Sequence, residues 1–377
     1  MSNTAVYLDY NASGLVRPQV IEAMAEALAA GGNPNAVHAL GRKARARVET
    51  ARAEVAELVG GDAASVVFSS GGTESNNQAI ASAIKAGCER LIICATEHPC
   101  VSETAACCGV EVELIPVTDR GLIDLEWLKD RLENGPRAFV AVHHANNESG
   151  VIQPVAEAAA LTHEHGGWMH VDAIQTAGKI VVDMAELGAD TLTLSAHKLG
   201  GPQGVGALIY RDQAPVVRVI HGSGQERGLR AGTENVAGIV GFGVSARLAA
   251  QEVPYSAAHV GWRDAAEARV KALGATVIGE GAPRLPNTLF MAVPDWESPS
   301  QLMTLDLQGI MVSAGMACSS GKSKPSKAIT AMGLHDVALG AIRVSGGWGT
   351  TEADWTRFAD AWTSEYEKRR ARRETAA

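Results

Sequence analysis

The sequence predicts an α/β protein, with a mostly parallel central sheet in a large domain and a smaller α+β domain. Short apolar runs of strand length alternate with helical patterns between residues 65 and 211, and this alternation implies crossover connections with helices on both faces of a sheet. After about Gln251 the order of elements changes, which indicates a second unit. A length of 377 residues, 46% of them hydrophobic and 20% charged, allows one large or two ordinary globular domains.

Two helices are expected before the first strand of the large sheet. Pro18 opens the first helical pattern, which ends at the glycine pair 31–32. Its apolar face consists of Val20, Ile21, Met24 and Leu28. The second pattern stops at the glycine pair 60–61, and its apolar face consists of Ala44, Val48, Ala51, Val55 and Leu58. Apolar faces of this kind are typical of helices that pack on a core.

Seven apolar segments predict the strands of the large sheet, with helical patterns such as 125–132 between several of them. The segments are 65–68, 91–95, 112–117, 138–144, 168–173, 191–196 and 206–211. In residues 191–194 polar and apolar side chains alternate, which is typical of a strand with one buried face.

The part of the chain beyond residue 251 predicts a helix, a strand near 287–293, a further helix, a loop, and a final strand and helix. We therefore expect a large domain over residues 15–252 and a small domain built from residues 1–14 and 253–377. The basic run near the C-terminus fits a solvated helix end, because the helix dipole favours positive charge there.

Charge and composition indicate which binding partners and which cellular compartment to expect. A formal net charge of -9 argues against general affinity for nucleic acid or for an anionic membrane. No apolar run approaches the length of a membrane span. Residues 1–14 lack the basic start and apolar stretch of a secretion signal, so a cytoplasmic protein is expected.

Lys198 stands where a predicted strand meets a glycine-rich stretch, in the sequence Ser-Ala-His-Lys. Ligands of α/β sheets collect at the carboxyl ends of strands. A lysine that is partly removed from water there loses its proton more readily, and it can then form a Schiff base with an aldehyde cofactor. A surface lysine after a strand is the plain alternative, so the interpretation depends on the rest of the chain.

Two segments that follow other strands supply partners for such a cofactor. Gly72 and Thr73 open a helix whose backbone amides could bind phosphate, although Gly-Gly-Thr also makes an ordinary helix cap. Asp172 ends a further strand, where a carboxylate could keep a pyridine nitrogen protonated or could simply cap a helix. An acid, a lysine and a phosphate loop are together the three parts of a pyridoxal phosphate site.

His98, Arg343 and Cys318 extend the hypothesis to a substrate. His98 follows a strand, where an imidazole can stack on a cofactor ring and exchange protons, or can be structural. Arg343 could hold a carboxylate through two parallel hydrogen bonds, or form a surface ion pair. Cys318 stands in a loop of glycine, serine and lysine, a setting that suits a thiol that reaches a bound substrate.

The remaining cysteines lie close together in the sequence, and none forms a CxxC pair. They are Cys88, Cys94, Cys100, Cys107 and Cys108. The spacing of Cys94, His98 and Cys100 fits no standard zinc pattern, so no metal is expected. We expect these five cysteines to be buried and to behave as small hydrophobic residues.

Taken together, these motifs resemble the cysteine desulfurases of the NifS/IscS type, in the class V aminotransferase group of pyridoxal phosphate enzymes. The resemblance covers nearly the whole chain and includes LDYNAS at 8–13, SSGGTESNN at 69–77, HVDAIQTAGK at 170–179, LSAHKLGGPQGVGAL at 194–208 and AGMACSSGKSKPS at 314–326. It implies the fold of a fold type I pyridoxal phosphate transferase, and a homodimer.

The resemblance also implies a role for each site residue. Lys198 would bind the cofactor covalently, Asp172 would pair with the pyridine nitrogen, Gln175 would contact the ring oxygen, and His98 would stack on the ring. The residues that would hold the phosphate are Gly72, Thr73, Ser195 and His197.

On the substrate side, the resemblance places Asn147 near the cofactor and near the substrate carboxylate, which Arg343 would bind. Thr233 would reach the phosphate of the partner subunit. The implied reaction converts L-cysteine to L-alanine and leaves sulfur as a persulfide on Cys318, for transfer to an acceptor protein such as an iron–sulfur scaffold or to a thio-cofactor pathway.

The chain departs from the family pattern at Met316, at Trp348 and at the pair Leu199 and Gly200. None of these positions carries a chemical role in the implied reaction. Two alternatives stay open: another enzyme of the same group, such as a selenocysteine lyase or an aminotransferase, in which Cys318 is dispensable, and a catalytically quiet paralogue that serves as a sulfur-relay partner.

Overall fold

A seven-stranded sheet with the order β2-β8-β7-β6-β5-β3-β4 organises the larger part of the chain. The computed structural model describes residues 5–314 and 326–376. The strands are β2 (Val66–Ser69), β3 (Arg90–Cys94), β4 (Glu111–Ile115), β5 (Ala138–His143), β6 (Trp168–Asp172), β7 (Thr191–Ser195) and β8 (Gly206–Tyr210). Strand β8 runs antiparallel to both of its neighbours, β2 and β7, and the other six strands all run in the same direction. The predicted mostly parallel sheet is confirmed, with each segment within two residues of its expected ends.

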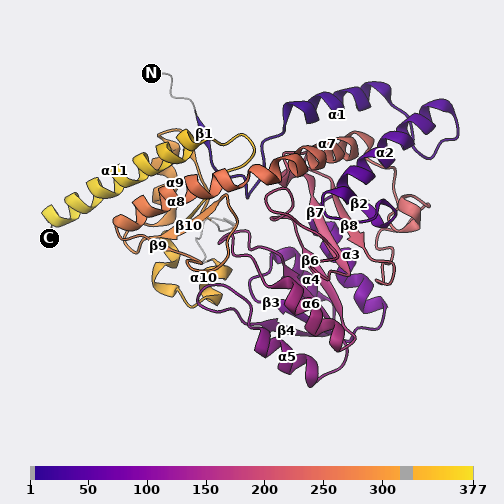
Figure 1. Ribbon diagram of the computed structural model, residues 1–377, viewed down its shortest axis with the longest axis horizontal. Coiled ribbons are helices and arrows are strands. Elements are labelled where there is room, and N and C mark those ends of the chain that lie inside the picture. Colours follow the sequence, from indigo (N-terminus) through magenta and orange to yellow (C-terminus); the bar gives the residue numbers. More distant parts are fainter. Residues whose placement is uncertain (1–4, 315–325, 377) are drawn as a thin grey trace.

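Helices cover both faces of this sheet, as predicted (Figure 1). They are α1 (Pro18–Ala30), α2 (Ala39–Glu57), α3 (Gly72–Lys85), α4 (Pro99–Cys107), α5 (Leu125–Glu133), α6 (Val155–Glu164) and α7 (Val236–Glu252). Apolar side chains of α2, α5, α6 and α7 share one core with the strands, while those of α3 and α4 share a second core on the opposite face. Because both faces are covered, β7 is buried along its whole length. The expectation of a single buried face for residues 191–194 was therefore wrong.

Helices α1 and α2 differ in how far they obey the sequence pattern. The predicted apolar face of α2 is buried throughout. Helix α1 packs on α7 and buries Val20, but Ile21 and Leu28 are 58% and 70% exposed in the single chain. The prediction of one apolar face on α1 is thus wrong as a description of the single chain, because α7 covers only part of that face.

A smaller unit contains a three-stranded sheet of order β12-β10-β9 and the strand pair β1-β11. Its strands are β1 (Val6–Tyr7), β9 (Thr276–Val277), β10 (Thr288–Ala292), β11 (Ile310–Met311) and β12 (Ala341–Ser345). Its helices are α8 (Ala257–Ala272), α9 (Ser298–Asp306), α10 (Lys327–Ala331) and α11 (Glu352–Ala376). The order of helix, strand, helix, strand and helix that the sequence indicated is present.

The N-terminal segment belongs by its pairing to this smaller unit. Strand β1 pairs in parallel with β11, and the Tyr10 amide donates to the Ser345 carbonyl oxygen at 3.1 Å. A core of residues from β1, α8, β10, β12 and α11 holds these segments together. The division into residues 15–252 on one side and residues 1–14 with 253–377 on the other stays a prediction.

Helix α7 leads into α8 through a single 3-10 turn, η4 (Val253–Tyr255). Across residues 5–314 and 326–376, no single helix is long and apolar enough to cross a membrane. The pair α7 and α8, bent by 75° at this turn, meets the criteria of length and composition only when the two helices are taken together.

Candidate active site

A cavity of about 350 Å³ at the carboxyl ends of β5, β6 and β7 collects most of the predicted site residues. The predicted residues that line it are Gly72, Thr73, His98, Asn147, Asp172, Gln175, Ser195, His197, Lys198 and Arg343. Asn11 and Ala12, from the segment after β1, line it as well. The cavity therefore lies where the large sheet meets the N-terminal segment and β12.

One end of this cavity is shaped for an anion. Helix α3 begins at Gly72, and no side chain caps its first amides. A Cβ at position 72 would clash with the side chain of Ile174, so glycine keeps the helix start close to the end of β6. Free amides and the helix dipole attract phosphate.

The side chains around this helix start agree with that assignment. Thr73, Ser195 and His197 line an opening next to Gly72. Burial and the nearby Lys198 ammonium lower the pKa of His197 to about 4, so its imidazole is neutral near pH 7 and can donate one hydrogen bond. The end of the cavity at α3 thus offers neutral donors and a helix N-terminus rather than a fixed counter-charge.

Lys198 lies in the short 3-10 turn η2 (Ala196–Lys198) that follows β7. Its Nζ donates to the carbonyl oxygens of Asn11, at 2.5 Å, and of Ala12, at 2.7 Å. Burial, followed by the positive charge of Arg343, lowers the pKa of Lys198 to about 8. The structure therefore supports the reactive amine that the sequence suggested.

Asp172 ends β6 on the other side of the cavity. Its Oδ2 accepts from Asn76 Nδ2 at 2.8 Å, and its Oδ1 accepts from the Ile174 amide at 3.0 Å. Burial and the negative charge of Glu97 raise the pKa of Asp172 above its usual range. The site thus holds a buried carboxylate that a cation would stabilise, as a protonated ring nitrogen would.

A chain of hydrogen bonds that the sequence analysis did not find fixes Asp172. Thr191 Oγ1 lies 2.8 Å from His170 Nδ1, and His170 Nε2 lies 3.0 Å from Asn76 Oδ1. Asn76 uses its Nδ2 for Asp172, so its Oδ1 accepts and His170 carries its hydrogen on Nε2. Burial lowers the pKa of His170 to about 3, which keeps this imidazole neutral. Asn76 and His170 lie in two of the motifs quoted above, at 69–77 and 170–179, but no local pattern pairs them.

Cys100 connects the same chain to His98. Its Sγ lies 3.1 Å from Asn76 Nδ2 and 3.0 Å from His98 Nδ1. Because Asn76 donates to the sulfur, the thiol hydrogen is left for His98, whose Nδ1 also accepts from the Cys100 amide at 3.2 Å. Burial raises the pKa of Cys100 to about 12, so the thiol keeps its hydrogen near pH 7. Neutral His98 therefore carries its own hydrogen on Nε2, as a donor.

Replacing Cys100 by alanine removes one of the two donors to His98 Nδ1. We expect the pKa of His98 to rise by up to about one unit, since a neutral hydrogen bond contributes about 0.5–1.5 kcal/mol. The measurement is the ¹⁵N shift of the two ring nitrogens in histidine-labelled protein across pH, with a His98→Gln sample to assign the signals. Cys100→Ser should restore the wild-type tautomer, and unchanged shifts in Cys100→Ala would contradict the role of the thiol.

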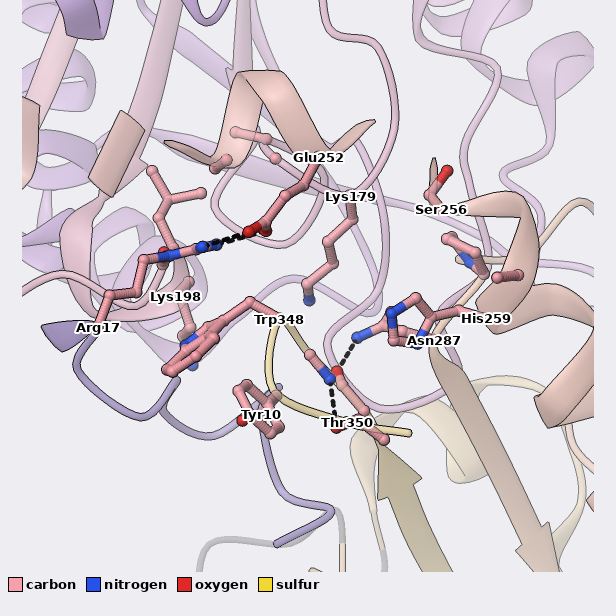
Figure 2. A pocket seen from close by; sticks show the side chains of 18 of the residues that line it. Tyr10, Arg17, Lys179, Lys198, Glu252, Ser256, His259, Asn287, Trp348 and Thr350 are labelled. Carbon is pink, nitrogen blue, oxygen red and sulfur yellow. Dashed lines mark hydrogen bonds and ion pairs between the residues drawn. The ribbon is translucent and has the colours of Figure 1, made fainter. Parts of the chain in front are cut away.

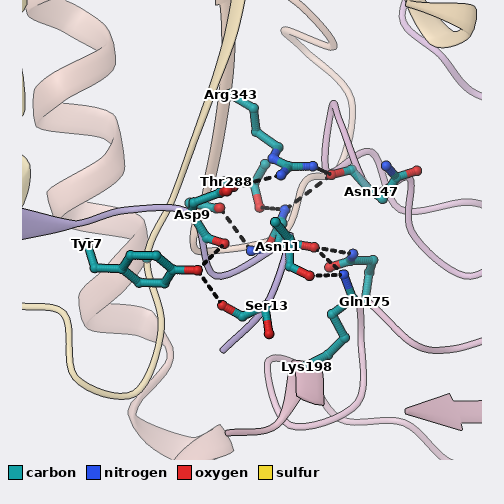
Figure 3. Close-up of polar contacts among 12 residues, drawn as sticks. Tyr7, Asp9, Asn11, Ser13, Asn147, Gln175, Lys198, Thr288 and Arg343 are labelled. Atoms are coloured by element: carbon teal, nitrogen blue, oxygen red, sulfur yellow. Dashed lines mark hydrogen bonds and ion pairs between the residues drawn. The ribbon is translucent and has the colours of Figure 1, made fainter. Parts of the chain in front are cut away.

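Arg343, on β12, reaches the cavity beside Asn147 (Figure 3). Its guanidinium donates to the Asn147 carbonyl oxygen at 2.9 Å and to Asp9 Oδ1 at 2.8 Å. Its Nε is buried without a partner in the described part of the chain. In the single chain Arg343 thus forms an ion pair, as the alternative interpretation of the sequence had it, but with the partly buried Asp9 rather than on the surface.

Gln175 takes part in a second polar group at the base of Lys198. Its Nε2 donates to the Asn11 carbonyl oxygen at 3.0 Å, the same oxygen that accepts from Lys198. Its Oε1 accepts from Lys179 at 2.9 Å. The sequence analysis assigned Gln175 but missed Asn11, which lies in the quoted LDYNAS motif.

Two predicted residues are not placed in the cavity. Thr233 lines a separate small pocket together with Ser70 and Gly204, two residues that also border the phosphate end. Cys318 lies outside the described residues. In the single chain, the geometry therefore neither brings Thr233 to the phosphate nor locates the thiol.

The prediction that the other five cysteines are buried apolar residues holds only in part. Cys88 and Cys94 are buried, Cys100 and Cys108 are half-buried, and Cys107 is exposed. Cys107 lies at the end of α4, where the last turn faces solvent. Within the described ranges, no cluster of three histidine, cysteine or acidic side chains could hold a metal ion.

The fold and the cavity define a class of protein, and comparison with known families agrees. The class-V aminotransferase family matches residues 6–358, and the chain belongs to this family. The NifS/IscS resemblance is confirmed by sequence. "Cysteine desulfurase IscS" of Dictyoglomus turgidum is 38% identical, over 97% of this chain and 95% of the relative. "Cysteine desulfurase" of Cereibacter sphaeroides is 40% identical, over 94% of each chain.

Solved structures give the same result for the fold. A NifS-like protein superposes with a TM-score of 0.88 at 33% identity, over 97% of this chain and all of the other. A NifS-like protein from Rickettsia africae gives a TM-score of 0.87 at 32% identity, over 96% of this chain and 99% of the other. The chain therefore has the fold type I architecture of pyridoxal phosphate enzymes.

The cavity fits pyridoxal phosphate, the cofactor of this group of enzymes. The uncapped start of α3 with Gly72 is suited to the phosphate, and within residues 5–314 and 326–376 the buried carboxylate of Asp172 forms no ion pair. Lys198, which lines the same cavity, supplies an amine of lowered pKa for the aldehyde. Each functional group of the cofactor thus finds a complementary group of the protein.

Proposed function

We propose that the protein is a cysteine desulfurase that converts L-cysteine to L-alanine and takes up the sulfur on Cys318. The observation that carries this proposal is the shared cavity, in which Lys198, Asp172 and Arg343 surround one space of about 350 Å³. Relatives that carry the name cysteine desulfurase match nearly the full length of the chain, which supports the assignment.

The residues of the cavity divide the work between holding the substrate and moving a proton. When bound, pyridoxal phosphate withdraws electrons from the substrate and so makes the Cα proton acidic. Lys198 Nζ, with a pKa of about 8, is neutral often enough near pH 8 to accept that proton. Arg343, with its unpaired Nε, binds the substrate carboxylate and sets which face of Cα points at the lysine.

The sulfur step needs a nucleophile other than the lysine. In the net reaction, Cys318 and L-cysteine give L-alanine and Cys318 persulfide. The Cβ–S bond of the substrate breaks and an S–S bond to Cys318 forms. Of the two thiol hydrogens, one ends on the substrate Cβ and the other on the persulfide. No external oxidant or reductant is required. A thiol suits this step because thiolates are strong nucleophiles toward sulfur.

The test is to incubate the cofactor-loaded protein with L-cysteine and to measure alanine and sulfide for the wild type and for Cys318→Ser. We expect Cys318→Ser to lose sulfur release at least 100-fold while its cofactor absorbance stays unchanged, because no other residue is assigned the attack on sulfur. Cys107→Ser, a change at an exposed cysteine, is the matched control and should keep full activity.

Other results of this assay favour the alternative functions. Sulfur release that persists in Cys318→Ser, or selenium release by this variant when L-selenocysteine replaces L-cysteine, indicates a lyase of the same group in which this cysteine is dispensable. Amino transfer to a keto acid indicates an aminotransferase. Cofactor binding without any turnover of L-cysteine indicates a quiet relay partner, and each of these outcomes contradicts the proposal.

The proposal includes a homodimer, an acceptor protein and a cytoplasmic setting. Exposed apolar side chains lie on α1 and in the segments that flank it, namely Leu15, Val16, Ile21, Leu28, Val37 and Leu40. A second copy that covers them would bury this surface and would bring Thr233 near a partner's phosphate site. We propose that sulfur from the persulfide passes to an acceptor such as an iron–sulfur scaffold, in keeping with the IscS name of relatives.

A further inference from the structure

A second cavity, of about 290 Å³, adjoins Lys198, and Figure 2 shows side chains that line it. Lys198 is the one lining residue that the two cavities share. The walls of the second cavity come from the end of α7 and from α8, from the residue before α1, from the segment after β6 that contains Lys179, and from the loop after β12. The proposed reaction uses none of these walls.

Aromatic side chains form part of these walls. Tyr10, Trp262, Trp348 and His259 line the space. The Arg17 guanidinium lies over the Trp348 ring, 5.2 Å from its centre, and it forms a two-point ion pair with Glu252 at 2.5 and 2.7 Å. The charges of Arg17 and Glu252 neutralise each other, so this ion pair adds little net charge to the cavity. The aromatic rings offer flat apolar surface to a ligand.

Lys179 is, beside the catalytic Lys198, a lysine of this cavity that forms no ion pair in the described part of the chain. Its Nζ donates to Asn11 Oδ1 at 2.7 Å and to Gln175 Oε1 at 2.9 Å, both neutral amide oxygens. In the described part of the chain no carboxylate pairs with it. Figure 2 shows its amine directed into the space between Trp348 and Asn287.

The electrostatic setting of Lys179 favours an anion. The charged and titratable groups around the cavity are Arg17, Lys179, Lys198, Glu252, His259 and Tyr10. Burial and the positive charges of Lys198 and Arg343 hold the pKa of Lys179 well below its usual range. A negative group beside the amine would reverse this shift, so such a ligand would bind together with a proton.

We propose that this cavity is a second ligand site, which takes a small carboxylate with a flat apolar body and pairs it with Lys179. Its volume, near the lower end for ligand pockets, fits a molecule of about ten non-hydrogen atoms. Asn11 joins the two cavities, since its side chain holds Lys179 and its carbonyl oxygen holds Lys198. An occupant that charges Lys179 therefore acts on the segment that positions the catalytic amine.

The test is calorimetric titration of the cofactor-loaded full-length protein with benzoate at pH 8, in two buffers of different ionisation enthalpy. We expect one benzoate per chain and net uptake of protons, because Lys179 gains positive charge on binding. Benzyl alcohol, which has the same ring without a charge, should not bind. The absence of saturable benzoate binding would refute the proposal.

Variants show whether Lys179 and this cavity are responsible. Lys179→Met should weaken binding at least tenfold and abolish proton uptake, whereas Lys129→Met, at an exposed lysine on α5, should change neither. If Lys179→Met fails to hold the cofactor, Ala258→Trp provides the same test, because it fills the cavity from an exposed position.

Binding at the substrate position is the main competing explanation. Arg343→Leu should leave benzoate binding intact but reduce proton uptake, because loss of the Arg343 charge raises the pKa of Lys179. Loss of benzoate binding would place the ligand in the cofactor cavity and overturn the proposal. The titration involves no turnover of L-cysteine. Its outcome is therefore independent of whether the desulfurase function holds.

Discussion

Replacing Lys198 by alanine is expected to abolish turnover of L-cysteine, with a loss on the order of 10⁴-fold or more. The variant lacks both the amine that holds the cofactor aldehyde and the base near the substrate Cα. Borohydride reduction followed by mass spectrometry measures the first loss, as cofactor attached to the tryptic peptide that contains residue 198. Alanine formation from L-cysteine measures the second.

The depressed pKa predicts how Lys198→Arg will behave. An amine with a pKa of about 8 is roughly half neutral at pH 8, whereas one at the usual value of 10.5 is only about 0.3% neutral. A guanidinium keeps its proton at every accessible pH. Lys198→Arg should therefore be as inactive as Lys198→Ala although it preserves the positive charge.

The pH dependence of covalent cofactor uptake follows from the same pKa. In the apo-protein, the rate should rise as pH increases through about 8, because the neutral amine is the reactive form. Lys129→Ala, at an exposed lysine, is the control for both readouts. Retention of covalently bound cofactor in Lys198→Ala would show that another residue holds it.

The sequence was sufficient to predict the two central residues of the site, Asp172 and Lys198, because they stand at the ends of parallel strands. Asp172 and Lys198 follow neighbouring strands β6 and β7, and the carboxyl ends of parallel strands meet at one edge. Short apolar runs bounded by turn residues define such strands well. The predicted strand ends therefore lie within two residues of the observed ends.

The residues that the sequence analysis missed act through pairing across the fold, which local patterns do not report. His170 and Asn76 are 94 positions apart, and Asn11 and Lys198 are 187 apart. A cysteine such as Cys100 is ordinarily expected to be a small apolar core residue, yet its sulfur on α4 lies against His98. Likewise, the exposure of Ile21 on α1 depends on how far α7 covers it, and no periodicity encodes that.

Asp172→Asn is expected to lower turnover of L-cysteine by roughly 10²–10⁴-fold. The amide keeps the shape of the carboxylate but removes the negative charge that a protonated ring nitrogen requires. The variant should still fold, because the buried carboxylate is costly without a cation. The measurements are alanine formation and the dissociation constant of the cofactor, which should weaken as the charge is lost. Full turnover in Asp172→Asn would contradict the assigned role.

Asn76 allows a sharper test of how Asp172 is held. If Asn76 acts by orienting the Asp172 carboxylate, then Asn76→Ala should cost about tenfold in turnover in the wild type. In the Asp172→Asn background, the same change should cost little, because the charge to be oriented is already gone. Equal losses in the two backgrounds would mean that Asn76 stabilises the protein by another route. A double-mutant cycle on turnover and on cofactor affinity therefore tests the hydrogen bonds that link Thr191, His170, Asn76 and Asp172. If they position the Asp172 carboxylate, the two losses depend on each other. If they are merely structural, the two losses are independent.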